Sequence, residues 1–327
     1  MILRLDRLMT ELPAAKEPSP NAAAAVQELL GGKFVEMSTL MNYTYQSFNF
    51  RGRAEQRPFY DLIANIAAEE FGHIELVAYA INLLLTGTTP RGSDPSKTPL
   101  GNVKDARNSY HYLATGQQAF CGDSQGKFWC GSNVFSSGNL KLDLLHNFFL
   151  ECGARAGKIR VYEMCKEPTA RALTGFLLVR GGVHIVAYAK ALEKLSGVAV
   201  GKLLPIPDIS NKRFPESARH EAKGLHRILY RFSPEDYRRV GEIWNGPHPE
   251  DGQELEVRDG PPEGAVPPDL EAEPQLTSPV GPDPSDLDPE MLEEYARRIF
   301  GPGIKDDLKK RKDDNGARRQ TKAAARR

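Results

Sequence analysis

Apolar residues recur at three- and four-residue steps in two stretches of the N-terminal third of the chain. The stretches cover about residues 22–50 and 55–85. This spacing is typical of helices that bury one face or more. Gly31 and Gly32 interrupt the first stretch, and glycine is a poor helix former. We therefore expect a short helix followed by a longer one there.

Two more helical stretches follow in the middle of the chain. Residues 140–166 and 169–195 have the same periodicity, and Pro168 separates them because proline cannot continue a helix. The connection between the two pairs, residues 87–137, is rich in Gly, Ser, Asn and Pro and has no sustained period. A helical pair, a long connection and a second pair predict an all-α fold, a four-helix bundle with one long crossover.

Beyond about residue 200 the pattern changes to short and irregular segments. We expect short helices at Ala218–Tyr230, Pro234–Trp244 and Glu290–Ile299. Residues 249–294 contain 15 acidic residues, one basic residue and 10 prolines, whereas residues 309–327 contain nine basic and two acidic residues. An acidic, proline-rich stretch of this kind does not bury enough apolar surface to fold alone.

These patterns predict three parts. They are an N-terminal arm (1–20), the helical bundle (21–200) and a C-terminal extension (201–327) made of an irregular arm and a basic tail.

The overall composition excludes several kinds of partner. Lys and Arg together number 43, as do Asp and Glu, so no net charge attracts nucleic acid or an anionic membrane. We find no apolar run close to the roughly 20 residues that span a bilayer. The N-terminus lacks the basic and then apolar order of a signal peptide. We therefore expect a cytoplasmic protein that binds neither nucleic acid nor membrane.

A carboxylate and an imidazole recur within the predicted helices. Glu70 and His73 are three residues apart and share one helix face. Glu-x-x-His from two helices, with one Glu from each of two others, builds the dinuclear site of ferritin-like bundles. The counterpart on the fourth helix is His184, but Gly181 stands where its glutamate would be. A carboxylate is missing from the symmetric arrangement.

Two further acids, Glu36 and Glu151, lie within apolar runs of the first and third helices. Burying an unpaired carboxylate is costly, so each needs a compensating partner. Few arginines or lysines fall on the same faces, which disfavours ordinary salt bridges and favours a metal pair. Oxygen and imidazole ligands suit manganese or iron, and the ligand types alone do not distinguish them.

Two more polar residues share faces with these acids. Tyr43 is seven residues after Glu36, and Lys158 is seven residues after Glu151, about two helical turns in each case. Tyr43 can hydrogen-bond a ligating carboxylate. Lys158 can place its ammonium where the missing fourth carboxylate would lie. The alternative for both residues is a side chain that faces solvent.

Together these motifs resemble the non-haem manganese catalases over about residues 1–240. The matching stretches are Glu28-Leu29-Leu30-Gly31-Gly32 before Glu36, Ala68-Glu69-Glu70-Phe71-Gly72-His73, Ser136-Ser137-Gly138-Asn139-Leu140 with Asp143 and Asn147, Glu151, and Leu178-Val179-Arg180-Gly181-Gly182-Val183-His184. The resemblance implies a ferritin-like bundle with two manganese ions per subunit. The ligands that it implies are Glu36, Glu70, His73, Glu151 and His184.

The resemblance also implies the reaction, disproportionation of hydrogen peroxide to water and dioxygen. In the family, Glu70 and Glu151 or their equivalents share the two metals, and a carboxylate such as Glu70 would help solvent to accept and return protons. Lys158 would tune proton transfer and anion access. Tyr43 would orient its carboxylate.

Other family features are matched to different degrees. Members carry either Glu or Gly at the position of Gly181, and this chain resembles the Gly type, which has a lysine near the site. A structural calcium in some members is bound by acids one and two turns before the Glu-x-x-His. Asp61 fits that calcium pattern, whereas Asn65 departs from it. Family members are commonly hexamers, so we expect a homo-oligomer in which the acidic arm lies on neighbouring subunits.

Two other functions fit the same sequence. One is a ferritin-like di-iron oxidase or peroxidase that needs an external reductant. The other is a structural relative, such as a spore-coat component, that retains the bundle without turnover.

Overall fold

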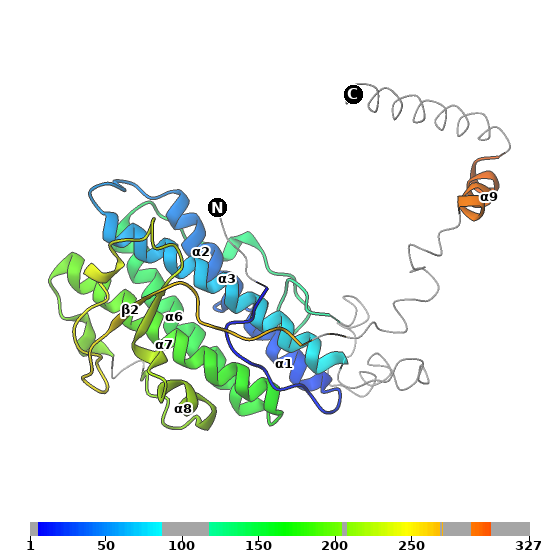
Figure 1. The fold of residues 1–327 in the computed structure, drawn as a ribbon. Helices are drawn as coiled ribbons and strands as arrows, with labels where there is room; N and C mark the ends of the chain where they lie inside the picture. The colour runs from blue at the N-terminus through cyan, green and yellow to red at the C-terminus, as the bar shows by residue number, and fades with distance from the viewer. Residues whose placement is uncertain (1–5, 87–117, 205–207, 269, 271–288, 302–327) are drawn as a thin grey trace, which may run out of the picture. The chain divides into compact units, whose positions relative to one another are not determined.

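Four helices lie side by side in the computed structural model and form the bundle that the periodicity predicts (Figure 1). They are α2 (Glu36–Phe48), α3 (Arg57–Thr86), α6 (Leu140–Met164) and α7 (Pro168–Ser196). The structure describes residues 6–86, 118–204, 208–268, 270 and 289–301. Helix α2 packs along α3 and α6 packs along α7, while α3 also contacts α7 and α2 contacts α6. The predicted all-α four-helix bundle is confirmed.

Local sequence signals set the ends of the second helical pair. The side chain of Asn139 accepts hydrogen bonds from the backbone N–H groups of Lys141 and Leu142 and so caps the start of α6. Glu167 caps α7 in the same way, and Pro168 occupies its first turn, where a missing N–H costs nothing. Gly197 ends α7 in the left-handed conformation, with φ of 73°.

The two glycines of the first stretch separate two helices, as predicted. Helix α1 (Pro20–Gly31) ends there, and α2 begins at Glu36. Gly31 also allows another segment to approach closely, because a Cβ on it would lie 2.2 Å from the carbonyl oxygen of Gly122. The side chain of Gln27 donates hydrogen bonds to the carbonyls of Phe120 and Gly122, at 2.8 and 2.7 Å. The end of the long crossover is therefore fixed on α1.

The predicted crossover, residues 87–137, is only partly described, because residues 87–117 lie outside the described residues. Within 118–137 the regular structure is a single 3₁₀ turn, η2 (Gly131–Asn133). The irregular structure expected for this segment is confirmed over that part.

Two apolar clusters fill the bundle on either side of a polar layer. One cluster contains the C-terminal half of α3, the first turns of α7 and much of α1. The other contains the N-terminal part of α3, the C-terminal half of α7, and Leu229 and Trp244 from beyond the bundle. Residues 69–73 of α3 and 180–184 of α7 lie between the two clusters and include the buried ionisable side chains of Glu69, Glu70, His73, Arg180 and His184.

Helix α7 is apolar enough to cross a membrane by length and composition, contrary to the expectation from the sequence. Its most apolar window is 100% buried in the protein. A helix that is apolar on all sides suits the centre of a bundle, where every face contacts protein. Its composition therefore reflects its central position.

The segment after the bundle differs from the two helices expected there. Helix α8 (Pro215–Glu221) is short, and the 3₁₀ turn η4 (Leu225–Arg227) leads into strand β1 (Ile228–Arg231), so the predicted helix at Ala218–Tyr230 is wrong at its end. Gly224 breaks the helix with φ of 76°. The predicted helix at Pro234–Trp244 reduces to one 3₁₀ turn, η5 (Val240–Glu242).

Strand pairing explains why the segment after Gly224 is not helical. Strand β1 pairs in parallel with β2 (Glu256–Asp259), with Ile228 opposite Glu256. The indole nitrogen of Trp244 donates to the carbonyls of Arg227 and Glu256, at 3.1 and 2.9 Å. These contacts connect the two strands to the same buried ring.

Two compact units divide the chain, Met1–Glu271 and Ala272–Arg327. The first unit therefore extends past residue 200, where we expected the bundle to end. The start of the chain also belongs to it, because Leu8 and Ala265 exchange backbone hydrogen bonds of 2.9 and 2.8 Å. In the second unit, helix α9 (Pro289–Phe300) confirms the short helix expected at Glu290–Ile299.

The close approach at Gly31 gives a test with an internal control. Gly31→Ala should destabilise the fold by about 1–3 kcal/mol, because its methyl group meets a backbone that cannot move away easily. The same substitution at Gly182, in α7, should stabilise it by roughly 0.5–1 kcal/mol. A Cβ there meets no atom within 4 Å outside its own helix backbone and immediate neighbours in the described chain. Urea unfolding of both variants measures the difference, and equal effects would contradict the packing described here.

Candidate metal centre

The five predicted ligands come from all four bundle helices and meet in the polar layer. Glu36 is the first residue of α2, Glu70 and His73 lie on α3, Glu151 on α6 and His184 on α7. All five are fully buried. Burial of three carboxylates is costly unless positive charge compensates them.

The ligand atoms form two groups that share one residue. Glu36, Glu70 and His73 form one group, and Glu70, Glu151 and His184 form the other, with the ligand atoms of each group within 4.8 Å of one another. Three side chains at this separation can contact one ion, so the arrangement suits two ions with Glu70 between them.

The orientation of Glu70 suits a bridging position. Its Oε2 lies 3.2 Å from Nδ1 of His73, and its Oε1 lies 2.8 Å from Nδ1 of His184. The same nitrogens lie 3.5 Å from Oε2 of Glu36 and 3.3 Å from Oε1 of Glu151. Each imidazole thus directs Nδ1 toward one oxygen of Glu70 and toward one further glutamate.

Several buried atoms of this set have no hydrogen-bond partner among the described residues. They are both Oε atoms of Glu36, Oε1 of Glu70, Oε2 of Glu151, Nε2 of His73 and both ring nitrogens of His184. Some of these atoms face charged neighbours, as Oε1 of Glu36 faces Nζ of Lys158 at 3.0 Å. Buried polar atoms are nearly always hydrogen-bonded, so a set of this size favours a bound ligand. Carboxylate oxygens and imidazoles are donors for manganese and iron, and the residues therefore fit a metal pair.

Lys158 lies where the sequence placed it, beside the position of the missing carboxylate. Its Nζ is 3.0 Å from Oε1 of Glu36. A Cβ on Gly181 would lie 3.3 Å from the same Nζ, so a longer side chain at residue 181 would compete with the ammonium for space. The solvent-facing alternative for Lys158 is wrong, because the residue is 1% exposed.

Tyr43 also lies in the centre, and its solvent-facing alternative is likewise wrong because the residue is fully buried. It shares a helix with Glu36, but its hydroxyl donates to Oε1 of Glu151 across the bundle, at 2.7 Å. A second hydroxyl, from Thr39 on α2, donates to Oε2 of Glu70 at 3.0 Å. The two hydroxyls orient two different carboxylates.

Glu69 is a residue of the centre that the sequence patterns did not single out. Its Oε2 lies 3.3 Å from Nε2 of His184, and its Oε1 lies 3.7 Å from Nε2 of His73. One carboxylate therefore faces the outer nitrogen of both imidazoles. Such outer carboxylates fix the orientation of histidine ligands and raise their basicity.

Arg180 balances the charge of Glu69. Its guanidinium donates two hydrogen bonds to the carboxylate, at 2.5 and 3.1 Å. Its remaining Nη1 donates to the carbonyls of Leu225 and Ile228, at 2.7 and 2.8 Å. A buried arginine four residues before His184 was the signal in the sequence that an additional carboxylate had to lie nearby.

Mutual charges decide the protonation of the metal-free site. Burial alone would lower the pKa of His73, but the carboxylates of Glu70, Glu36 and Glu69 outweigh it and raise the pKa to about 10. Burial would likewise lower the pKa of Lys158, but Glu36, Glu151 and Glu70 raise it. Burial would raise the pKa of Glu36, whereas Lys158 and His73 bring it well below its usual range. Metal ions must therefore displace protons from the imidazoles when they bind.

Asp61 and Asn65, the residues of the calcium pattern, already have partners within the protein. Asp61 forms an ion pair of 2.6 Å with Arg57 and accepts a hydrogen bond of 3.0 Å from the backbone of Arg239. Asn65 donates to the carbonyl of Tyr230 and accepts from the N–H of Phe232, so that its amide joins α3 to β1. In the ion-free protein the guanidinium of Arg57 supplies the positive charge beside Asp61.

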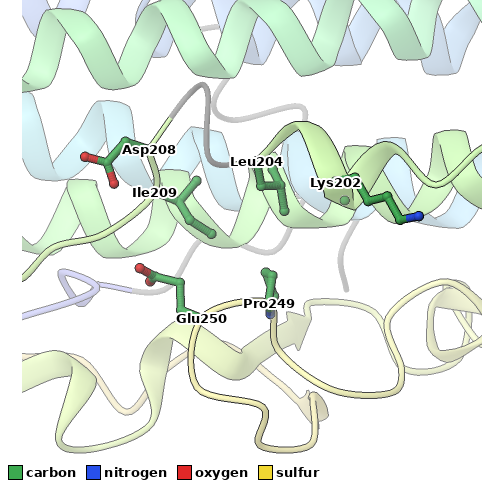
Figure 2. Close-up of a pocket in the computed structure, with 7 residues that line it drawn as sticks. Lys202, Leu204, Asp208, Ile209, Pro249 and Glu250 are labelled. Atoms are coloured by element: carbon green, nitrogen blue, oxygen red, sulfur yellow. The ribbon is translucent and has the colours of Figure 1, made fainter.

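A surface pocket elsewhere contains none of these residues (Figure 2). Its volume is about 260 Å³, and it is lined by Gly201, Lys202, Leu204, Asp208, Ile209, Pro249 and Glu250. The five candidate ligands are buried and do not line this pocket.

Two groups of candidate metal ligands that share one glutamate lie inside a four-helix bundle of the ferritin-like class. The family described as Manganese containing catalase matches residues 1–288. The chain therefore belongs to the manganese-containing catalase family.

Individual relatives are more distant. A manganese catalase of Bacillus subtilis (strain 168) is 32% identical over 190 residues, which are 57% of this chain and 68% of that protein. The uncharacterized protein YjqC of the same organism is 33% identical over 181 residues, 54% of this chain and 64% of YjqC. The matched region thus spans about two thirds of the length of each relative. The crystal structure of wild-type KatB, a manganese catalase from Anabaena, has 22% identity and a TM-score of 0.49, covering 80% of this chain and all of KatB.

The position of Glu69 leads to a test of metal retention. Glu69→Gln should weaken metal binding about 10–100-fold, because both imidazoles lose the carboxylate that orients them. Glu75→Gln changes a glutamate of the same helix outside both ligand groups and is the matched control. Metal content after dialysis against a chelator measures the effect. Equal retention by the two variants would show that Glu69 does not orient the imidazoles.

Proposed function

We propose that this chain is a manganese catalase, which converts hydrogen peroxide to water and dioxygen with two manganese ions per subunit. The observation that carries the proposal is the sharing of Glu70 by two ligand groups, each completed by one imidazole and one further glutamate. Membership of the family supports the same reaction. When bound, a redox-active metal pair supplies the two-electron exchange with peroxide that side chains cannot perform.

The charges in the centre support this reaction over that of a four-carboxylate oxidase site. Three carboxylates and two neutral imidazoles contribute a formal charge of −3. Gly181 supplies no fourth carboxylate, and the ammonium of Lys158 lies beside that position. Fewer anionic ligands disfavour high oxidation states of the ions and leave room for solvent or peroxide.

The side chains of the centre position donors and hold protons. Tyr43 occupies Oε1 of Glu151 with a hydrogen bond, and Oε2 is left without a hydrogen-bond partner among the described residues. Lys158 holds its proton 3.0 Å from Oε1 of Glu36. Glu70 can accept and return a proton between the two groups. Because the whole set is buried, bulk water is kept from the reacting atoms.

An assay without reductant tests the reaction directly. Protein produced with manganese should release oxygen steadily from hydrogen peroxide alone and should contain about two manganese ions per chain, since two ligand groups are present. Glu70→Ala and His73→Ala should lose both the metal and the activity. If these variants decomposed peroxide and bound manganese like the parent, the assignment would be wrong. A requirement for added reductant would favour the di-iron oxidase or peroxidase instead.

Paired substitutions test the roles of Tyr43 and Lys158. Tyr43→Phe and Lys158→Met should each lower kcat about 10–100-fold, because a ligating carboxylate loses its partner. Tyr45→Phe, at a tyrosine of the same helix that is 44% exposed, should leave kcat unchanged. Steady-state oxygen release, with metal content measured on the same samples, separates loss of turnover from loss of metal. Unchanged kcat in both variants would remove these residues from the mechanism.

We also propose that the chain assembles into a homo-oligomer, a hexamer by resemblance to the family. Large apolar side chains are exposed on two bundle helices: Tyr45 and Phe48 on α2, and Leu142, Leu145 and Phe149 on α6. Their spacing on α6 places the last three on one side of that helix. Apolar surface of this kind supports burial against other copies of the chain.

Light scattering tests the assembly and the contribution of the arm separately. Leu145→Asp combined with Phe149→Asp should lower the mass to that of a smaller species, whereas Leu203→Asp, at another exposed apolar residue, should not. Truncation after Glu271 tests the arm without removing Trp244, which is 1% exposed and part of the core. An unchanged mass of the truncated chain would exclude the part of the arm after Glu271 from assembly. An unchanged mass of the double variant would exclude the α6 surface.

A further inference from the structure

A second group of side chains with metal-ligand chemistry lies outside the bundle centre. His226 belongs to the turn η4, and His248 and Asp251 belong to the turn that connects Pro247 with Glu254. One ligand atom from each of the three lies within 4.8 Å of the others. Nε2 of His226 is 2.9 Å from Oδ2 of Asp251, and Nδ1 of His248 is 3.6 Å from its Oδ1.

Backbone hydrogen bonds fix the turn that carries two of these side chains. The N–H of His248 donates to the carbonyl of Gln253 at 2.7 Å, and the N–H of Gly252 donates to the carbonyl of His248 at 2.9 Å. The N–H of Gln253 also donates to Oδ1 of Asp251, at 3.0 Å. The carboxylate is therefore held toward the two imidazoles before any ion binds.

Access and one unpaired ring nitrogen also support a ligand here, while Nδ1 of His248 accepts a hydrogen bond of 3.3 Å from the backbone N–H of Glu250. The side chain of His248 is 3% exposed, whereas those of His226 and Asp251 are 15% and 31% exposed, so the group opens to solvent on one side. Nδ1 of His226 is buried without a hydrogen-bond partner among the described residues. Arg227 is the competing cation, with Nε 3.6 Å from Oδ2 of Asp251. An ion pair between Arg227 and Asp251 alone would not explain why the imidazole of His248 also faces this carboxylate.

We propose that His226, His248 and Asp251 bind one divalent ion of the zinc class, with solvent completing its coordination. Two imidazoles and one carboxylate with an open position are a ligand set of zinc and similar ions. Nitrogen-rich sites bind zinc more tightly than manganese, whereas the bundle centre is rich in oxygen. The two sites therefore differ in the ion that they favour.

The position of this site connects it to the bundle. An ion bound there would join the 247–254 turn to η4, and the carbonyls of Leu225 and Ile228, on either side of His226 and Arg227, hold Arg180. Arg180 in turn holds Glu69 against the imidazoles of the metal centre. The ion would thus stabilise η4 and the 247–254 turn, next to the carbonyls that hold Arg180. Its role is structural.

Zinc binding to the manganese-loaded full chain tests the proposal. The parent and the His146→Gln variant, which loses a histidine elsewhere, should each bind about one zinc ion while retaining their manganese. His226→Gln and Asp251→Asn should bind zinc at least about tenfold more weakly, since even an outer partner of a metal site is worth that much. Equilibrium dialysis with elemental analysis gives both metals, and circular dichroism confirms the fold of each variant.

The outcomes separate a metal site from an ion pair. Loss of zinc in both variants with unchanged manganese supports the site. No zinc in the parent, equal zinc in the two variants, or zinc gained only as manganese is lost would overturn it. Asparagine has nearly the same shape as aspartate, and residue 251 lies on an exposed turn. The Asp251→Asn variant therefore tests the site even if His226→Gln does not fold.

Discussion

The whole bundle depends on holding three carboxylates and two imidazoles together without water. Each glutamate of the centre would be destabilising alone, since burial opposes its charge. The protein places them in one layer across four helices and leaves the compensating charge to be supplied by ions and by Lys158. The two apolar clusters on either side then fix the separation of the helices that carry them. The positive charge that compensates the buried carboxylates therefore contributes both to the stability of the bundle and to its capacity to bind metal ions.

The contacts that position Glu69 beside the imidazoles extend beyond the four helices. Glu69 faces both imidazoles, Arg180 neutralises Glu69, and two backbone carbonyls of the segment near β1 hold Arg180. The arginine thus transmits the position of an irregular segment to the metal ligands. Residues 201–271 belong to the same compact unit as the bundle.

Periodicity was sufficient to predict the four helices, because a helix face repeats along the sequence. The residues singled out on those faces, among them Tyr43 and Lys158, are buried in the structure, and metal binding by the five glutamates and histidines stays a prediction. Glu69 was missed because its role depends on Arg180, more than a hundred residues away, and helical spacing says nothing about such a pair. Strand β1 was mistaken for helix because its apolar run is short and its partner, β2, lies in an acidic stretch that looked unable to fold. In both cases the structure depends on a contact between residues far apart in the sequence: the ion pair of Arg180 with Glu69, and the pairing of β1 with β2.

The bond between Arg180 and the carbonyls of Leu225 and Ile228 has a consequence for the order in which the protein is made. A nascent chain that has reached Ser196 already contains all five ligands, but it lacks the carbonyls that hold Arg180 and, through Glu69, the imidazoles. A chain interrupted before residue 228 therefore contains all five candidate ligands but lacks a carbonyl that holds Arg180, and through Arg180 the carboxylate of Glu69.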